Sequence, residues 1–290
     1  MHPYQYYPAT NLSEAISLLS RYGERARILA GGTDLLVQLR GERFELDAVV
    51  DVKQVPEIME LRLNGGLIIG AAVACYQIYE DGAIAKAFPG IIDAASLIGG
   101  IQIQSRASLG GNLCNATPSA DGICPLIVHS AVATITGVDG TRTVLVEEFC
   151  TGPGRNVLAA GELLLNIRIE APLANFGAAY QRFIPRNEMD IAIAGVATSV
   201  VLDAKGETIQ SGRIALAAVG PTPIFAKKAS ASLAGQPATA ETFEKAGEIA
   251  GTEASPITDM RGTIDQRKHL VGVLTRRTLA VAPDRARGTA

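Results

Sequence analysis

The spacing of hydrophobic and polar positions predicts an α+β protein. Residues 11–22 carry apolar side chains at helical spacing, with Asn11 placed to cap a helix and Gly23 placed to end it. Further helices are predicted at residues 33–39, 76–87, 90–99 and 121–130, strands at 26–30, 48–52, 66–74, 131–137, 143–147 and 162–170, and a glycine-rich loop at 108–119. Several of these strands follow one another directly, so an antiparallel sheet is expected in the middle third.

The last third of the chain has a different order of elements. After a linker at residues 171–175, three alternating segments predict antiparallel strands at 176–183, 191–203 and 209–219, with a hairpin turn at 203–206. Helical spacing then predicts helices at 223–233, 240–250 and 262–278, and the tail after Ala280 is expected to fray. We therefore predict three units, residues 1–55, 56–172 and 173–290, the last a three-stranded sheet with helices.

Composition and charge exclude several classes of protein. Of the 290 residues, 48% are hydrophobic and 19% charged, which argues against extended disorder. The 26 basic and 29 acidic residues nearly balance, so a nucleic-acid or anionic-membrane binder is not expected. No apolar run reaches the roughly 18 residues of a membrane span, and no export signal is visible, which predicts a cytoplasmic protein. The four cysteines and three histidines lack the spacing of a metal site or disulfide framework.

Two glycine pairs are the strongest candidates for chemistry. They occur in Ala30-Gly31-Gly32-Thr33-Asp34 and in Ser108-Leu109-Gly110-Gly111-Asn112. Glycine permits close backbone approach to a ligand, and successive free N–H groups can bind an anion such as a diphosphate. Either pair alone is also explained by a simple turn. The fingerprints of Rossmann and P-loop sites are absent, so a dinucleotide held between two separate loops is the remaining nucleotide-binding arrangement.

The motifs around these glycines resemble a known family. The segments 30–36 (AGGTDLL), 108–121 (SLGGNLCNATPSAD), 152–155 (GPGR), 161–164 (GELL) and 186–192 (RNEMDIA) look like the FAD-binding medium subunit of molybdenum hydroxylases, the xanthine dehydrogenase and carbon monoxide dehydrogenase group. The terminal residues Arg261-Gly262 and 267–270 also fit, so the resemblance covers nearly the whole chain. It implies a vanillyl-alcohol-oxidase-like (PCMH-type) FAD-binding fold, with a C-terminal three-stranded sheet and helix bundle.

The resemblance also implies which residues bind FAD. By position, Gly31, Gly32, Thr33 and Asp34 hold the diphosphate from one side, and Gly110, Gly111 and Asn112 from the other. Ala30 and Ser108, which flank the two glycine pairs, are also expected to bind the cofactor. The remaining cofactor-binding positions are Thr117 and Asp121 at the ribose, Leu164 and Leu165 as apolar lining, Arg182 at the polar edge of the flavin, and Asp190 and Ile191 beside the isoalloxazine. A helix N-cap is the alternative for Asp121, and an ordinary core position is the alternative for the leucines. No His or Cys falls at a covalent flavin position, so noncovalent FAD is expected.

In the family that the chain resembles, other subunits carry out the substrate chemistry. The resemblance implies an electron-transfer subunit that receives electrons from two-iron two-sulfur clusters of a small subunit. A large subunit with a molybdenum cofactor would oxidise the substrate, in a dimer of heterotrimers. One alternative is a stand-alone FAD-dependent reductase of the same fold, resembling the enolpyruvyl-sugar reductase, for which only Glu162 and Glu188 are candidate proton donors. A second is a nucleotide-binding module without redox turnover. Neither the organic substrate nor the final electron acceptor is indicated.

Overall fold

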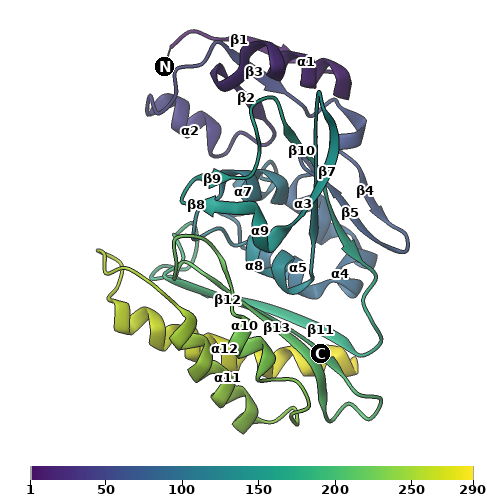
Figure 1. The fold of residues 1–290 in the computed structure, drawn as a ribbon, viewed down its shortest axis with the longest axis vertical. Coiled ribbons are helices and arrows are strands. Elements are labelled where there is room, and N and C mark those ends of the chain that lie inside the picture. The colour runs from purple at the N-terminus through teal and green to yellow at the C-terminus, as the bar shows by residue number, and fades with distance from the viewer. Residues whose placement is uncertain (1, 290) are drawn as a thin grey trace.

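This computed structural model describes residues 2–289, which form three larger sheets in succession and one two-stranded ribbon (Figure 1). The first sheet is parallel in the order β1-β3-β2, from β1 (Gln5–Pro8), β2 (Ala26–Leu29) and β3 (Ala48–Asp51). Helices α1 (Leu12–Tyr22) and α2 (Leu35–Arg40) make the crossovers that parallel strands require. The predicted caps of α1 are present, because Asn11 Oδ1 accepts the Glu14 N–H at 2.9 Å and Gly23 has a φ of 51°.

The second sheet is antiparallel and carries most of the short helices. Its order is β4-β5-β10-β6-β7. The strands are β4 (Leu61–Leu63), β5 (Gly66–Gly70), β6 (Val132–Gly137), β7 (Gly140–Leu145) and β10 (Leu163–Glu170). The helices are α3 (Cys75–Glu80), α4 (Gly82–Ala87), α5 (Pro89–Ala95), α6 (Ile101–Gln104), α7 (Leu109–Asn115), α8 (Ile123–Val128) and α9 (Val146–Phe149). A two-stranded ribbon of β8 (Cys150–Gly152) and β9 (Arg155–Asn156) follows α9.

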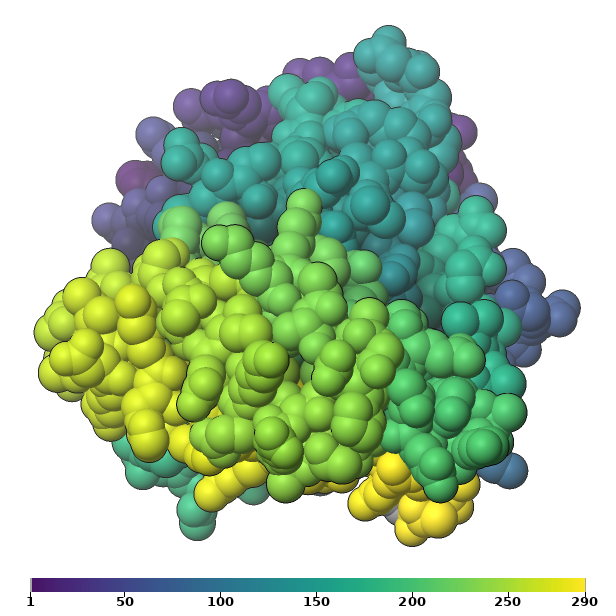
Figure 2. Space-filling model, turned by 60° about the horizontal axis from the view of Figure 1, so that its bottom comes forward, coloured from purple at the N-terminus to yellow at the C-terminus, as the bar shows by residue number. Residues whose placement is uncertain are grey.

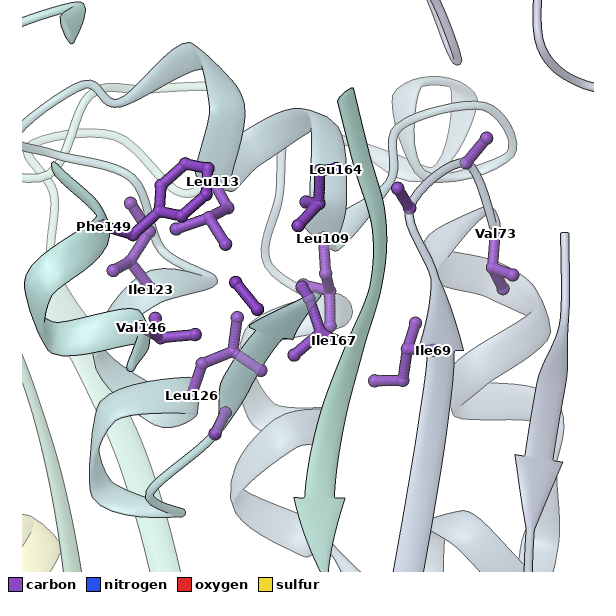
Figure 3. Close-up of a cluster of buried hydrophobic side chains, with 14 of the residues drawn as sticks. Ile69, Val73, Leu109, Leu113, Ile123, Leu126, Val146, Phe149, Leu164 and Ile167 are labelled. Carbon is purple, nitrogen blue, oxygen red and sulfur yellow. The ribbon is translucent and has the colours of Figure 1, made fainter. Parts of the chain in front are cut away.

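One buried cluster joins the first two sheets. Val50 of β3 and Ile69 and Ile167 of the second sheet belong to it, all at most 1% exposed. Leu109 and Leu113 of α7 are buried in the same cluster, where Figure 3 shows them with Phe149 and Ile167. Burying these two leucines fixes the face that α7 turns inward, so the glycines between them have a defined orientation.

The third sheet has its own core and lies between two layers of helices. Strands β11 (Phe176–Phe183), β12 (Ala194–Leu202), β13 (Ile209–Ala217) and the short β14 (Ile224–Phe225) are antiparallel in chain order. Helices α10 (Lys227–Ala231), α11 (Ala240–Glu253) and α12 (Ile264–Arg287) complete this unit. Helices α10 and α12 pack against its strands, and Figure 2 shows the yellow-green segments on the side that faces away from the first unit. Helices α5 and α8 pack against the strands from the second unit. The predicted boundaries at 55/56 and 172/173 fall between the sheets and stay a prediction.

Three expectations about local structure were wrong. The glycine-rich segment expected to be a loop contains helix α7, because Ser108 caps it and two leucines bury one side of it. The tail expected to fray is helical to Arg287, and Gly288 caps this helix. The C-terminal sheet has a fourth strand, β14, of two residues.

Ion pairing explains why the C-terminal helix continues. The Arg285 guanidinium donates to both carboxylate oxygens of Asp93 in α5, at 2.6 and 3.0 Å, and to the Ala178 carbonyl at 2.8 Å. The Asp93 carboxylate also accepts the Tyr180 N–H at 3.0 Å. These contacts join the end of α12 to the second unit and to β11.

Removing the Arg285 side chain is expected to destabilise the chain by about 1–3 kcal/mol, since Arg285→Ala leaves a half-buried carboxylate with fewer donors. Urea unfolding of the wild type and the variant measures the difference. Arg277→Ala is the matched control, because Arg277 is exposed on the same helix. Equal unfolding midpoints for Arg285→Ala and wild type would contradict this role.

Candidate functional site

A cleft of about 720 Å³ opens where the first two units meet. Its size is within the ordinary range of ligand sites. The walls come from both glycine pairs, from the β8–β9 ribbon and the chain that follows it, and from apolar residues of both units. The second unit contributes the apolar residues Ile58, Ala71, Ala72, Ile98, Ala107, Leu158, Ala159, Ala160 and Leu164, and the first unit adds Leu19, Ala26, Ile28, Ala30, Leu35, Phe44 and Val52.

The first glycine pair follows β2 and presents free backbone donors. Gly31 lies against the backbone of Arg106, so closely that a Cβ on Gly31 would stand 2.0 Å from the Arg106 carbonyl oxygen. Gly32 has a φ of +73°, which only glycine adopts without strain. Within residues 2–289, no acceptor is hydrogen-bonded to the backbone N–H groups of residues 31–34. Four free donors beside a cleft suit an anionic group.

The second glycine pair begins helix α7 instead of forming a loop. Ser108 caps this helix, its Oγ accepting the Gly111 N–H at 2.9 Å. Gly110 packs on Ala71, where a Cβ would stand 2.4 Å from the Ala71 carbonyl oxygen. A Cβ on Gly111 would meet only Ser108 Oγ, at 3.0 Å, so that side of the first turn is open toward the cleft. Asn112 Oδ1 accepts the Gly122 N–H, which orients the side chain and leaves its amide as a donor.

A charged group fixes the start of the first glycine loop. Lys53 Nζ lies 2.7 Å from Asp51 Oδ2 and donates to the Ala30 carbonyl at 3.2 Å. Tyr6 donates its hydroxyl to the same carboxylate at 2.6 Å. The hydrogen bond of Lys53 holds the pKa of the Asp51 carboxyl down against the effect of burial, as does that of Tyr6. The loop therefore leaves β2 in a direction set by the first sheet.

The later family motifs also reach the cleft. Gly154 donates its N–H to the Ala116 carbonyl, and Asn156 Nδ2 donates to the Cys114 carbonyl at 2.7 Å. These bonds hold the ribbon against the end of α7. Leu164 of β10 is 3% exposed and lines the cleft.

The structure brings ten of the predicted site residues together and leaves six away from the lining. Those lining the cleft are Ala30, Gly31, Gly32, Thr33, Asp34, Ser108, Gly110, Gly111, Asn112 and Leu164. Those outside the lining are Thr117, Asp121, Leu165, Arg182, Asp190 and Ile191. Their direct contact with a cofactor stays a prediction.

Two of the six residues outside the lining pair with each other. Asp121 forms a short salt bridge with Arg182 of β11, and the side chains are 9% and 6% exposed. Asp121 also accepts the Tyr180 hydroxyl hydrogen bond at 2.7 Å. Burial raises the pKa of the Asp121 carboxyl, and the Arg182 charge and the Tyr180 hydroxyl oppose that effect. Asp121 is not a helix N-cap, because Gly122 holds that position in α8.

The segment after β11 is exposed. Asp190 pairs with Arg186 at 3.0 Å, and this hydrogen bond lowers the pKa of the Asp190 carboxyl. Ile191 is 48% exposed. Met189 lies near Gly100, where a Cβ would stand 3.2 Å from its sulfur. Gly100 follows the cleft residue Ile98 by two positions, so this segment lies near that part of the cleft.

Sequence reasoning missed the cationic residues of the cleft. Arg27, Arg43 and Arg155 line it together with Phe44. The two glycine pairs had indicated backbone N–H donors for an anion and no particular arginine. Arg155 stands in the quoted Gly-Pro-Gly-Arg motif, and this was a usable signal, but residues 41–46 carry no motif that indicates a ligand.

The side chains of Cys114 and His129 are both uncharged near neutral pH. Cys114 is the cysteine of the lining, and burial raises its pKa to about 12, so the thiol stays protonated near neutral pH. His129 is buried away from the lining, where desolvation lowers its pKa to about 4. Within residues 2–289, no three His, Cys, Asp or Glu side chains are placed to hold a metal ion. In the same part of the chain, no helix has the length and apolar character needed to cross a membrane.

Two family models match the chain in series. The FAD binding domain in molybdopterin dehydrogenase matches residues 2–172, and the CO dehydrogenase flavoprotein C-terminal domain matches residues 178–282. The chain is 32% identical over 286 residues to the xanthine dehydrogenase FAD-binding subunit of Escherichia coli O157:H7, covering 98% of this chain and 97% of that protein. It is 30% identical over 285 residues to the carbon monoxide dehydrogenase medium chain of Afipia carboxidovorans, covering 98% of each.

A solved structure has the same fold over nearly the whole length of the chain. A chain of carbon monoxide dehydrogenase from Hydrogenophaga pseudoflava, in a form lacking the Mo-pyranopterin moiety of the molybdenum cofactor, superimposes with a TM-score of 0.92. The two chains are 30% identical, and the match covers 98% of this chain and 99% of that one.

Proposed function

The chain belongs to the FAD-binding subunits of the molybdenum hydroxylase family, and from this premise we propose that it carries electrons from iron–sulfur clusters of a partner subunit, through FAD, to an external acceptor. The family and its FAD-binding fold are those that the motifs predicted. The observation that supports the proposal most directly is the cleft with two glycine pairs and free N–H donors between two units of the chain.

The residues present fit FAD. We propose that the N–H groups of residues 31–34 hold the diphosphate from one side and those of Leu109 and Gly110 from the other. These N–H groups have no acceptor within residues 2–289, and neither glycine pair puts a side chain in the way. The apolar lining around Ala71, Ile98 and Leu164 would exclude water from the isoalloxazine. Bound FAD supplies the redox chemistry, taking up and releasing electrons, while the protein binds and orients it.

The two candidate proton donors do not suit a stand-alone reductase. Such an enzyme needs a proton donor beside the flavin. Glu162 lines the cleft, but its pKa is lowered by the hydrogen bonds from Arg142, at 2.6 and 2.7 Å, so it is ionised near neutral pH. Glu188 is exposed and outside the lining. A subunit that only passes electrons requires no such acid.

The partners follow from the same family. We propose a large subunit with a molybdenum cofactor and a small subunit with two-iron two-sulfur clusters, assembled as a dimer of heterotrimers in the cytoplasm. The relatives named medium chains support a multi-subunit complex. The four cysteines are free, which suits a reducing compartment.

Purification through a tag on this chain tests the proposal. Two further polypeptides, flavin absorption and an underlying iron–sulfur absorption are expected to copurify, and mass photometry or light scattering would report whether the heterotrimer dimerises. A chain that binds FAD but copurifies with nothing, and reduces a substrate by itself, would support the stand-alone reductase. A chain that binds nucleotide but no reducible flavin would support the non-redox alternative.

FAD is expected to leave the protein completely on acid denaturation. The cleft cysteine is a protonated thiol and the buried histidine lies elsewhere, so neither is placed to bond to the flavin. Precipitating the protein with acid and measuring flavin in the supernatant and pellet checks this. Yellow protein in the pellet after repeated washing would contradict noncovalent binding.

A further inference from the structure

An aromatic ring of the first unit lies close to two arginines in the cleft. The Arg27 guanidinium carbon lies 4.7 Å from the centre of the Phe44 ring, and that of Arg43 lies 5.7 Å from it. All three residues line the cleft. Arg27 is fixed by donating to the Glu24 and Ala26 carbonyls, each at 2.8 Å. We call Arg27, Arg43 and Phe44 the arginine–phenylalanine cluster.

Two of the arginines that line the cleft have no anionic partner among the described residues. Within residues 2–289, the side chains of Arg43 and Arg155 make no ion pair or hydrogen bond. Arg43 extends toward the β8–β9 turn, because a Cβ on Gly154 would stand 3.4 Å from its terminal nitrogen. Exposed arginines are common, but both of these line the cleft, and Arg43 lies over an aromatic ring. Such a combination suits a ligand that is both flat and anionic or polar.

The position of the cluster in the cleft indicates which part of FAD it would bind. Arg43 lies beside Gly154, whose N–H donates to the Ala116 carbonyl just after the end of α7, whereas the apolar residue Ala71 packs on Gly110 in the first turn of α7. Arg43 and Ala71 therefore lie toward opposite ends of this helix, and the second glycine pair lies at the end nearer Ala71. If the diphosphate lies at the glycine pairs and the isoalloxazine at the apolar lining around Ala71, the adenosine half reaches the cluster.

The chemistry of the cluster matches adenosine. A purine stacks on aromatic rings and on planar guanidinium groups, and such stacking is largely independent of the hydrogen-bonding edge of the base. Arginine also donates to ribose hydroxyl and phosphate oxygens.

We propose that the arginine–phenylalanine cluster binds the adenosine half of FAD and thereby selects FAD over FMN. This inference rests on the proposed function, since it requires the diphosphate and isoalloxazine to lie as described there. Phe44 and Arg43 are then specificity-determining residues, and FMN, which lacks the adenosine half, does not use them.

The test compares the affinities of two flavins for the full chain after its own flavin has been removed. Fluorescence titrations give dissociation constants of wild type, Phe44→Ala and Arg43→Ala for FAD and for FMN. We expect the FAD dissociation constant to rise about tenfold or more in each variant and the FMN constant to change less than about twofold. Arg40→Ala is the matched control, because Arg40 is an exposed arginine of α2 outside the cleft lining. Its constants for both flavins should equal those of the wild type.

The outcomes separate this inference from the proposed function. If Phe44→Ala and Arg43→Ala leave FAD binding unchanged, or weaken FAD and FMN equally, the cluster does not bind adenosine. Phe44 also packs beside Leu39 and Leu46, so Phe44→Ala can destabilise the first unit, and Arg43→Ala then decides because its side chain is exposed. Failure of the wild type to bind either flavin would overturn the proposed function itself.

Discussion

Gly31→Ala is expected to yield a chain that purifies without FAD. The added Cβ would stand 2.0 Å from the Arg106 carbonyl oxygen, 2.5 Å from its carbonyl carbon and 3.0 Å from the Ala107 nitrogen. All three are backbone atoms, which cannot rotate away as the end of a side chain can. The loop of residues 31–34 must therefore move, and its free N–H groups no longer converge on one anion. Losing two hydrogen bonds to a charged group costs about 3 kcal/mol or more, which corresponds to roughly a hundredfold loss of affinity.

Flavin content per chain and the FAD dissociation constant measure this effect. Gly82→Ala is the control, because Gly82 is the first residue of α4 and a Cβ there would meet nothing within 4 Å. A melting curve of each flavin-free chain separates loss of binding from unfolding. A folded Gly31→Ala chain with the FAD affinity of the wild type would show that the first glycine pair does not hold the diphosphate.

Local sequence signals were sufficient for much of the fold. Strand β11 was predicted at its exact bounds, and α1 was predicted with both of its caps. These elements have regular spacing of apolar residues and strong end signals, so neighbouring residues alone decide their structure. The exposed turn after β12 was equally predictable, since Asp203 accepts the N–H groups of Glu207 and Thr208.

The elements that were mispredicted depend on distant contacts. Helix α7 contains two adjacent glycines, which lower helix propensity, but burial of Leu109 and Leu113 and the Ser108 cap outweigh that cost. The end of α12 contains Pro283, and its helix persists because Arg285 binds Asp93, 192 residues away in the chain. Such long-range pairings cannot be recognised from the residues that are neighbours in the sequence.

The candidate site was likewise predicted where local sequence signals are sufficient and missed where contacts between distant residues decide. Glycine pairs are a local signal for close backbone approach, and the structure places both in one cleft. The roles of Asp121 and Arg182 were inferred separately, one at the ribose and the other at the flavin edge, whereas the structure pairs them with each other. A contact between residues 61 positions apart cannot be seen in a motif that contains only one of them.

Asp121→Ala is expected to destabilise the flavin-free chain by about 3–5 kcal/mol. Arg182 would then be a buried cation without a counter-ion, and its Nε already lacks a hydrogen-bond partner in the described part of the chain. The Tyr180 hydroxyl would lose its acceptor as well. Urea unfolding measures the loss. Because removing both charges avoids the unpaired cation, the double variant Asp121→Leu with Arg182→Met should be markedly more stable than Asp121→Ala.

The same variant decides between the two roles of this carboxylate. If Asp121 acts by holding β11 against the second unit, FAD affinity measured well below the melting temperature should follow the stability of the variants, and the double variant should recover both. If Asp121 binds the ribose, the double variant should recover stability but not FAD affinity. The buried salt bridge and the absence of Asp121 from the cleft lining favour the first result. A fully stable Asp121→Ala chain with weak FAD binding would establish the second.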